Sequence, residues 1–327
     1  MSLVSETESK MAEKLREAIW SSKVKAVVLP VVGIITFLLL WSGVASQIDT
    51  SLGKFPGPAA VYEQAVALYD EFVVESDKAD AFYQRQEERN AMKLKMDPNY
   101  EPVTREYTGK ETFFDQIITS LITVMAGFLI ACLIAIPLGI AIGINQALMQ
   151  AVNPIIQVFK PVSPLAWLPL ITMIVSAVYV TDDPLVPKSF LTSMFTVMLC
   201  CLWPMLINTA VGVASVPNDL RNVARVIKLP TLTFVWKVII PSAIPMIFTG
   251  MRLSLGIAWM VLIAAEMLAQ SPGLGKFVWD EFQNGSSNSL ARIMVAVLVI
   301  GLIGFLLDRI MLLIQNWASW DKSNKAS

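Results

Sequence analysis

Histidine is absent from the 327-residue sequence. Its absence excludes bis-histidine haem ligation, histidine-based zinc sites and general-base catalysis by imidazole. We therefore expect no metal site, and most classes of membrane enzyme are disfavoured because no cluster of other catalytic residues replaces the imidazole. A Gly-Lys-Ser/Thr phosphate-binding loop is also missing, so the chain does not supply an ATPase of its own.

Cysteine and charge are both scarce. Cys132, Cys200 and Cys201 lie in apolar runs, where thiols behave as small hydrophobic groups rather than as disulfide partners. Charged residues make up only 16% of the chain and hydrophobic residues 55%, and the mean hydropathy is +0.60. This composition fits neither a soluble domain nor a disordered one. We expect an all-α, polytopic membrane protein that binds no nucleic acid.

Six apolar runs are long enough to cross a bilayer, which requires roughly 20 mostly apolar residues. The first covers residues 26–48. The uncharged stretch 116–159 leaves two arrangements open, one span followed by a connector or a hairpin of two spans. A single span that ends near Ile144 is favoured, because Asn145 begins a more polar stretch. The remaining runs cover residues 161–179, 189–214, 242–268 and 293–314.

Basic residues set the expected orientation, since short cytoplasmic loops are rich in Lys and Arg. With residues 1–25 as a cytoplasmic arm and 317–327 as a cytoplasmic tail, four crossings return the chain to the cytoplasm at segment 219–241. That segment has one acid, Asp219, against the bases Arg221, Arg225, Lys228 and Lys237. A hairpin at 116–159 would place it outside. The opposite loop, 181–188, leans acidic, as expected of an external loop.

Residues 49–115 form the one hydrophilic region, which we expect to be a periplasmic insertion. It opens with FPGP, a plausible helix start, and apolar residues then recur at helical spacing. These residues are Val61, Ala65, Leu68 and Phe72. The later part, through Asp97, mixes acids and bases and is typical of a solvated surface. A core of five spans follows at 116–316.

Residues 218–230 are expected to form a short amphipathic helix. Asn218 or Asp219 is the expected cap, and Pro230 ends the helix after about three turns. Its apolar face consists of Leu220, Val223, Ala224 and Ile227. Its basic side consists of Arg221, Arg225 and Lys228. Two interpretations stay open, an interfacial helix whose cations meet lipid phosphates and a helix that inserts into another protein.

NVARVIKLPTLTFVWKVIIP, residues 222–241, resembles the cytoplasmic-loop signature of ABC importer permeases. The signature has Glu-Ala-Ala, a Gly four residues on, and Ile-x-Leu-Pro. Asn222 stands at the Glu position and Lys228 at the Gly position. The rest of the frame is carried by Val223, Ala224, Val238, Ile240 and Pro241.

Other stretches within residues 113–315 are similar to the permeases that import nitrate, bicarbonate, taurine and alkanesulfonates. These are SPLAWLPL at 163–170, GMRLSLGIAWMVLIAAEML at 250–268 and SPGLGKFVWDEF at 271–282. NVARV at 222–226 and QNGSSNSLARIM at 283–294 most resemble nitrate permeases. The resemblance implies six transmembrane helices and a cytoplasmic coupling helix at 218–230, in a bacterial inner membrane protein.

The resemblance also implies partners. Two cytoplasmic ATPases would hold ATP and Mg, so no cofactor is expected on this chain itself. A second permease copy would complete a homodimer, and a periplasmic or lipid-anchored binding protein would deliver the anion. The residues that would contact the ATPases are Arg221, Asn222, Val223, Ala224, Arg225, Ile227 and Lys228.

Arg252 and Glu266 are candidate residues of the anion pathway, because ionisable groups inside spans face protein or water. Arg252 offers positive potential for an oxyanion, or alternatively reaches the cytoplasmic interface. Glu266 helps to gate the pathway or to orient its neighbours, or alternatively is only a capping or ion-pairing residue at the membrane interface, near the end of its span. Trp167 and Trp259 are further pathway candidates, although tryptophan commonly anchors spans at the interface.

Gly139 and Gly143 form a small-xxx-small pair after Pro137, which indicates close helix packing rather than a ligand site. The function that follows from the resemblance is import of a small oxyanion, most simply nitrate or nitrite. Bicarbonate or taurine and alkanesulfonates are the alternatives within this class. An ion-coupled secondary carrier is disfavoured, because such carriers contain inverted repeats and several midplane ionisable groups.

Overall fold

The computed structural model describes residues 22–50, 53–97, 99–180 and 186–318. Nearly all elements within these ranges are helices, and the expected all-α polytopic fold is confirmed. The exception is an antiparallel pair of two-residue strands, β1 (Asp49–Thr50) and β2 (Gly53–Lys54). Parts of the expected arm, tail and external loop lie outside the described residues, namely 1–21, 319–327 and 181–185.

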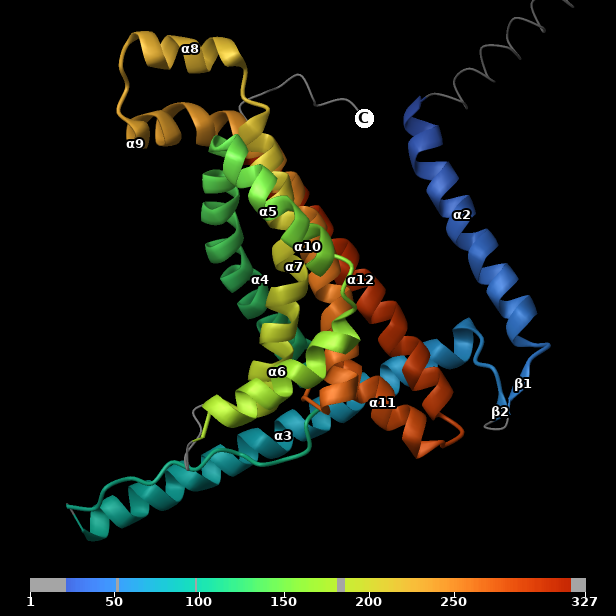
Figure 1. The fold of residues 1–327 in the computed structure, drawn as a ribbon. Coiled ribbons are helices and arrows are strands. Elements are labelled where there is room, and N and C mark those ends of the chain that lie inside the picture. Colours follow the sequence, from blue (N-terminus) through green and yellow to red (C-terminus); the bar gives the residue numbers. More distant parts are fainter. Residues whose placement is uncertain (1–21, 51–52, 98, 181–185, 319–327) are drawn as a thin grey trace, which may run out of the picture.

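Five helices in the described part of the chain are long and apolar enough to cross a membrane. The first is α2 (Ser22–Ala45), which ends at Ala45 rather than at residue 48 and stands apart from the bundle (Figure 1). The long helices of the bundle are α4 (Phe113–Ile144), α7 (Lys188–Ala214), α10 (Ile240–Ala269) and α12 (Ser289–Ala318). Because α4 continues to Ile144, the single span favoured there is confirmed.

The third expected run, 161–179, holds one continuous helix, α6 (Pro164–Val178), but its 15 residues are too few to cross a membrane alone. The expected connector before it is also helical, α5 (Gln146–Phe159), and the two helices are bent by 96°. Pro161 follows the end of α5, and Pro164 opens α6, so neither residue has an N–H to continue a helix across the break. Counting the bent pair as one span raises the number of crossings to six.

The two ends of the bundle differ. The short helices α8 (Asn218–Val226) and α9 (Thr231–Phe234) lie at one end (Figure 1). The long helix α3 (Pro58–Met96) and α11 (Leu274–Asn284) lie at the other. The basic segment and the hydrophilic insertion are therefore on opposite ends, as six crossings require.

Helix α7 is packed between α4 and α10, and glycines of α4 allow the close approach. A Cβ added at Gly139 would lie 2.7 Å from Thr209 Cβ, and one at Gly143 would lie 2.5 Å from the Ala210 carbonyl oxygen. The predicted packing role of the Gly139 and Gly143 pair is confirmed. Gly127, which precedes Gly139 by twelve residues on α4, meets the Met194 carbonyl oxygen of α7 in the same way.

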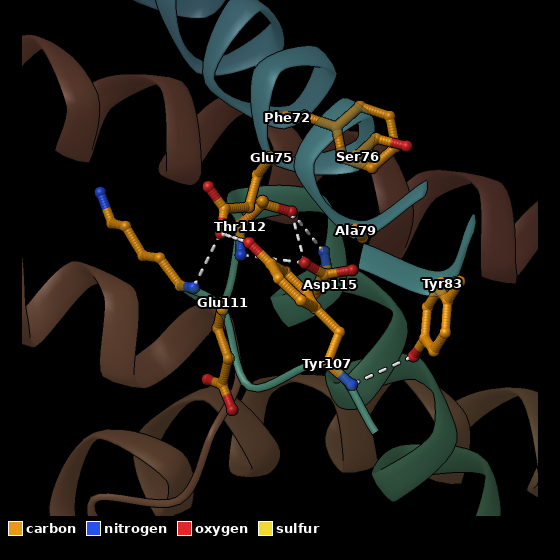
Figure 2. Close-up of a pocket in the computed structure, with 11 residues that line it drawn as sticks. Phe72, Glu75, Ser76, Ala79, Tyr83, Tyr107, Glu111, Thr112 and Asp115 are labelled. Atoms are coloured by element: carbon orange, nitrogen blue, oxygen red, sulfur yellow. Dashed lines mark hydrogen bonds between the residues drawn. The ribbon is translucent and has the colours of Figure 1, made fainter. Parts of the chain in front are cut away.

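The insertion is held to α4 by a polar seam around a cavity of about 360 Å³ (Figure 2). Glu75 of α3 accepts hydrogen bonds from the Tyr107 hydroxyl at 2.8 Å and the Lys110 backbone N–H at 3.1 Å. The Tyr107 hydroxyl and then the Lys78 ammonium hold the pKa of Glu75 below its ordinary value. The seam ends at the capping box of Thr112 and Asp115, which starts α4.

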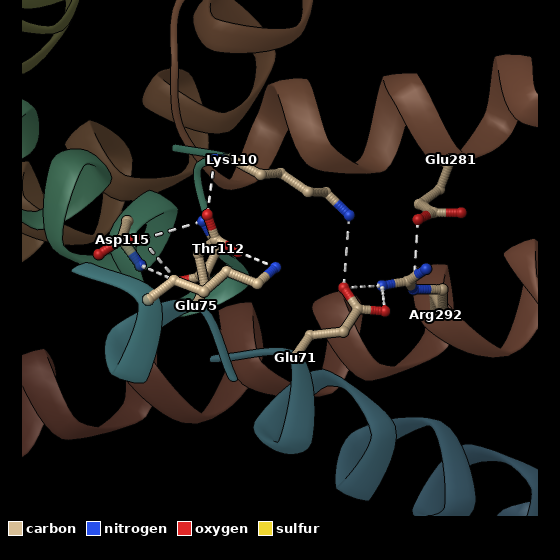
Figure 3. A network of polar contacts seen from close by, with 8 residues as sticks. Glu71, Glu75, Lys110, Thr112, Asp115, Glu281 and Arg292 are labelled. Atoms are coloured by element: carbon tan, nitrogen blue, oxygen red, sulfur yellow. Dashed lines mark hydrogen bonds and ion pairs between the residues drawn. The ribbon is translucent and has the colours of Figure 1, made fainter. Parts of the chain in front are cut away.

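A second contact joins α3 to α11 and α12 (Figure 3). Arg292 at the start of α12 donates to Glu71 of α3 at 2.7 Å and forms an ion pair with Glu281 of α11 at 3.2 Å. Lys110 also lies 3.5 Å from Glu71. Val61 and Leu68 of α3 are buried, so the expected apolar stripe of this helix packs on the core.

Candidate functional site

Helix α8 starts at Asn218, directly after Pro217, which takes the cap position without a side-chain hydrogen bond. The expected cap at Asn218 or Asp219 is therefore wrong. Proline fits there because its fixed φ leads the chain into the first turn, and Asn218 already has a helical conformation. The helix ends at Val226, four residues before Pro230, so Pro230 does not end it either.

The end of α8 is a left-handed turn at Lys228, which has φ 52°. The Lys228 N–H donates to the Arg225 carbonyl at 3.1 Å, and the Leu229 N–H donates to the Ala224 carbonyl at 3.0 Å. This pair of bonds is a Schellman motif, whose left-handed position is usually Gly. The Gly of the family signature is thus replaced by Lys, and the turn forms nevertheless.

Lys228→Gly is expected to stabilise the folded chain by about 1 kcal/mol, because a Cβ is disfavoured in the left-handed region. Thermal unfolding of the detergent-purified chain checks this gain. Lys237→Gly is the control, since Lys237 lies in a helical segment and its replacement should destabilise the chain. Equal loss of stability in both variants would contradict the assigned role of the turn.

The faces of α8 are rotated relative to the expected ones. Ala224 is buried at 6% exposure and faces its own chain, over a cleft of about 460 Å³ that Ile144 and Phe234 also line. Val223 is 57% exposed and Val226 is 80% exposed. Asn222 and Arg225 are exposed as well, as are Leu220, Ile227 and Lys228. Val226 was not among the expected contact residues, although its exposed apolar side chain suits that role.

Arg221, one of the expected contact residues, is bonded to its own chain. Its guanidinium donates to the Val213 carbonyl at 2.8 Å and to the Val216 carbonyl at 3.3 Å, so it caps the C-terminus of α7. Cations are favourable at that position because of the orphan carbonyls and the helix dipole. Arg221 therefore joins α8 to the end of α7.

Glu266 is fully buried near the end of α10. Its carboxylate accepts from the Ser120 hydroxyl of α4 at 2.7 Å and from the Gly275 N–H of α11 at 2.9 Å. The Ser120 oxygen in turn accepts from the Leu274 N–H at 2.9 Å. Glu266 thus joins α4, α10 and the N-terminus of α11, where negative charge is favoured.

The two glycines of the SPGLG stretch at 271–275 allow the start of α11 to lie close against α10. Gly273 has φ 148°, and a Cβ there would lie 2.3 Å from the Glu266 carboxyl carbon. A Cβ at Gly275 would lie 2.1 Å from the Ile263 carbonyl oxygen. Both glycines are required for Glu266 to reach the start of α11.

Arg252 is paired with a carboxylate that the sequence reasoning missed. Its Nη2 lies 2.9 Å from Oδ2 of Asp308 on α12, and the two side chains are 38% and 34% exposed. Asp308 and Arg309 both fall inside the expected sixth span. Two adjacent charges in an apolar run could have indicated from sequence that one of them pairs with another helix. Arg309 lies over the ring of Phe305.

The two tryptophan candidates lie in different places. Trp259 is buried, donates to the Ile300 carbonyl at 2.9 Å and contacts α12 where Gly304 leaves room. Trp167 of α6 stacks on Phe159 at the end of α5. Phe159 also stacks on Trp203 of α7. Arg252 and Trp259 therefore contact α12, whereas Glu266 contacts α4 and α11, and these candidates do not converge on one cavity.

Comparison with known proteins identifies the class of molecule. Residues 135–319, more than half of the chain, match the family described as "Binding-protein-dependent transport system inner membrane component". The chain belongs to this family of ABC importer permeases. Within the family it falls in the nitrate and bicarbonate group.

Two curated relatives from Synechococcus elongatus illustrate this group. The permease is 33% identical over 301 residues to the bicarbonate transport system permease protein CmpB, with 91% of each chain covered. It is 37% identical over 164 residues to the nitrate import permease protein NrtB, which covers 50% of this chain and 55% of that protein. The permease thus spans about half the length of the nitrate relative that it matches.

A solved structure supports the fold. The permease superposes on a chain of the MetNI methionine ABC transporter, in an inward facing conformation, with a TM-score of 0.53 and 14% identity. The superposition covers 63% of the permease and 95% of that chain. At this identity the likeness shows the fold alone.

Proposed function

We propose that this permease is the membrane subunit of an ATP-driven importer of a small oxyanion, with nitrate or nitrite as the first candidate substrate. Bicarbonate is the second candidate, and the CmpB relative, matched over 91% of both chains, supports it. Taurine and alkanesulfonates are the third. The observation that carries the coupling part of the proposal is the exposed apolar surface of α8.

The connections of α8 support its role as a coupling helix. It is followed by α9, by a π-helical turn at Val235–Ile239 and then by α10 without a long loop. Through Arg221 it is also bonded to the end of α7. A displacement of α8 by a partner ATPase would therefore move two core helices together, as a rigid-body rearrangement requires.

In this proposal two ATPases hold ATP and Mg and carry out its hydrolysis, and the permease binds no cofactor of its own. The α8 end and both termini face the cytoplasm, and α3 and α11 face the periplasm, where the binding protein docks. A second permease copy completes a homodimer. Two apolar residues of α6 that are strongly exposed in the single chain support a contact with that copy, namely Ile174 and Val178.

The proposal is tested by reconstituting the permease with its ATPases and binding protein in proteoliposomes. Uptake of labelled nitrate and labelled bicarbonate is then measured with ATP or with a non-hydrolysable analogue inside. ATP-dependent uptake of one anion, driven by the binding protein, is expected. Uptake that persists without ATPases would instead indicate a secondary carrier.

Arg252→Gln is expected to lower the unfolding temperature by about 3 °C, because Asp308 is then left unpaired within a span. Arg252→Gln combined with Asp308→Asn should restore most of that loss. Thermal unfolding and uptake are measured on the same preparations. A double variant that is stable yet retains a raised KM for the anion would show that Arg252 contacts the substrate as well.

A further inference from the structure

A cavity of about 560 Å³ opens between α6, the first turns of α7 and the last residues of α10. It lies at the same end of the bundle as α3 and α11 (Figure 1). Its apolar wall includes Leu168, Met173 and Leu268. Its polar lining consists of Thr172, Ser176, Lys188, Ser189 and Thr192.

Among the residues that the structure describes, Lys188 is the one charged residue that lines this cavity. Within the described ranges its ammonium group forms no ion pair, unlike the charged groups of Lys276 and Arg292 at the same end. Lys276 is paired with Asp280 at 3.0 Å, and Arg292 is paired with Glu71 and Glu281. No carboxylate in the described part of the chain neutralises Lys188, so its positive charge is available there to a ligand.

Hydrogen-bond donors accompany this charge. Thr172 and Thr192 donate to carbonyls of their own helices, at 2.8 Å and 2.9 Å, so their protons are already used. Ser176 and Ser189 donate to no group in the part of the chain that the structure describes, so both hydroxyls can bind an acceptor. An oxyanion has several acceptors and no requirement for a deep apolar pocket.

The start of α7 adds to the preference for an anion. This 27-residue helix begins at Lys188, and Pro187 at the cap position offers no side-chain acceptor to the first-turn N–H groups. Unsatisfied N–H groups and the helix dipole favour negative charge at such a position. Arg252, the cation expected from sequence, is by contrast neutralised by Asp308.

We propose that this cavity is the external anion-binding site of the importer and that it holds a small monovalent oxyanion on Lys188, Ser176 and Ser189. The inference rests on the proposed import function and adds where the anion first meets the permease. The cavity is much larger than a nitrate ion and is partly open, so the anion binds weakly and passes on. Weak binding suits a site that must release its ligand inward.

The test uses the assembled transporter in proteoliposomes, with nitrate and bicarbonate as separate substrates. Lys188→Ala is expected to raise KM about tenfold, in the range of electrostatic attraction of charged ligands, with kcat and the ATPase rate nearly unchanged. Lys188→Glu should raise KM further, and Lys188→Arg should keep most of the affinity. Ser176→Ala combined with Ser189→Ala should raise KM several-fold without a change of charge.

Lys276→Ala is the matched control, because it removes a paired cation at the same end and should leave KM unchanged. Wild-type uptake with unchanged KM in Lys188→Ala and Lys188→Glu would overturn the binding site while the import function stands. A lowered kcat with unchanged KM would assign Lys188 a structural role and would also overturn it. If the wild-type assembly takes up neither anion, the proposed function fails and the site fails with it.

Discussion

Val223→Glu is expected to abolish ATP-driven uptake while the permease stays folded. Val223 is 57% exposed on α8, so a carboxylate there meets only water in the isolated chain. In the assembled transporter the same carboxylate would be buried without a partner against the ATPase, which costs several kcal/mol. We expect association with the ATPase to weaken about 100-fold or more, equivalent to roughly 3 kcal/mol.

Three measurements follow this variant: co-purification with the ATPase, stimulation of ATP hydrolysis by the loaded binding protein, and anion uptake. All three should be lost, and unfolding temperature should be unchanged. Val226→Glu should behave alike, since Val226 is 80% exposed on the same helix. Val223→Ala is the control and should retain most activity.

Ala224→Glu is also expected to uncouple transport from ATP hydrolysis. Here the loss would come from a displaced α8 as well as from altered contact with the ATPase. Ala224 is buried against its own chain, so a glutamate there displaces α8 from the cleft beneath it. Its unfolding temperature should therefore fall, which distinguishes it from Val223→Glu. Normal uptake in Val223→Glu and Val226→Glu, together with weaker binding to lipid vesicles, would place α8 on the membrane surface and refute the coupling role.

The long helices were predictable because hydropathy and proline are local signals. A run of apolar residues of sufficient length must have its backbone hydrogen bonds satisfied internally, so α4, α7, α10 and α12 follow from the sequence alone. The Gly139 and Gly143 pair likewise predicted close helix packing, which the structure shows against α7. The bend between α5 and α6 was not predictable by hydropathy, because residues on both sides of it are apolar. Pro161 and Pro164 marked its place without giving its angle.

The orientation of α8 was less predictable, because it depends on contacts outside the helix. The apolar pattern grouped Ala224 with Val223, yet these two side chains face different surroundings. Arg221 bonds to carbonyls of α7, and this contact turns Ala224 toward the core. A helical pattern gives the faces of a helix but not which of them its own chain will cover.

The polar pairs of the spans could not be predicted for a related reason. Arg252 and Asp308 are 56 positions apart, and Glu266 and Ser120 are 146 apart. Spacing within one helix says nothing about such partners. Arg252 and Glu266 were singled out from the sequence as charges inside a span. Their hydrogen bonds join helices, and whether either residue also meets the anion stays a prediction.

Glu266→Ala is expected to destabilise the permease by about 2–4 kcal/mol, because several buried groups lose their partner at once. The Ser120 hydroxyl and the Gly275 N–H would be left without an acceptor. Gly273 packs directly against the Glu266 carboxyl group, so no neighbouring side chain has room to replace it as acceptor. Thermal unfolding measures the loss. Hydrogen exchange at Leu274 and Gly275 should rise most, since α11 loses its attachment to α10 and α4.

Glu266→Gln separates hydrogen bonding from charge. Its amide oxygen can still accept from Gly275 or Ser120, so stability should lie between those of the wild type and Glu266→Ala. Glu87→Ala, on the exposed surface of α3, is the control and should leave unfolding unchanged. If Glu266→Ala instead unfolds like the wild type but loses uptake, the carboxylate acts in the anion pathway, and its role as the joint between α4, α10 and α11 is refuted.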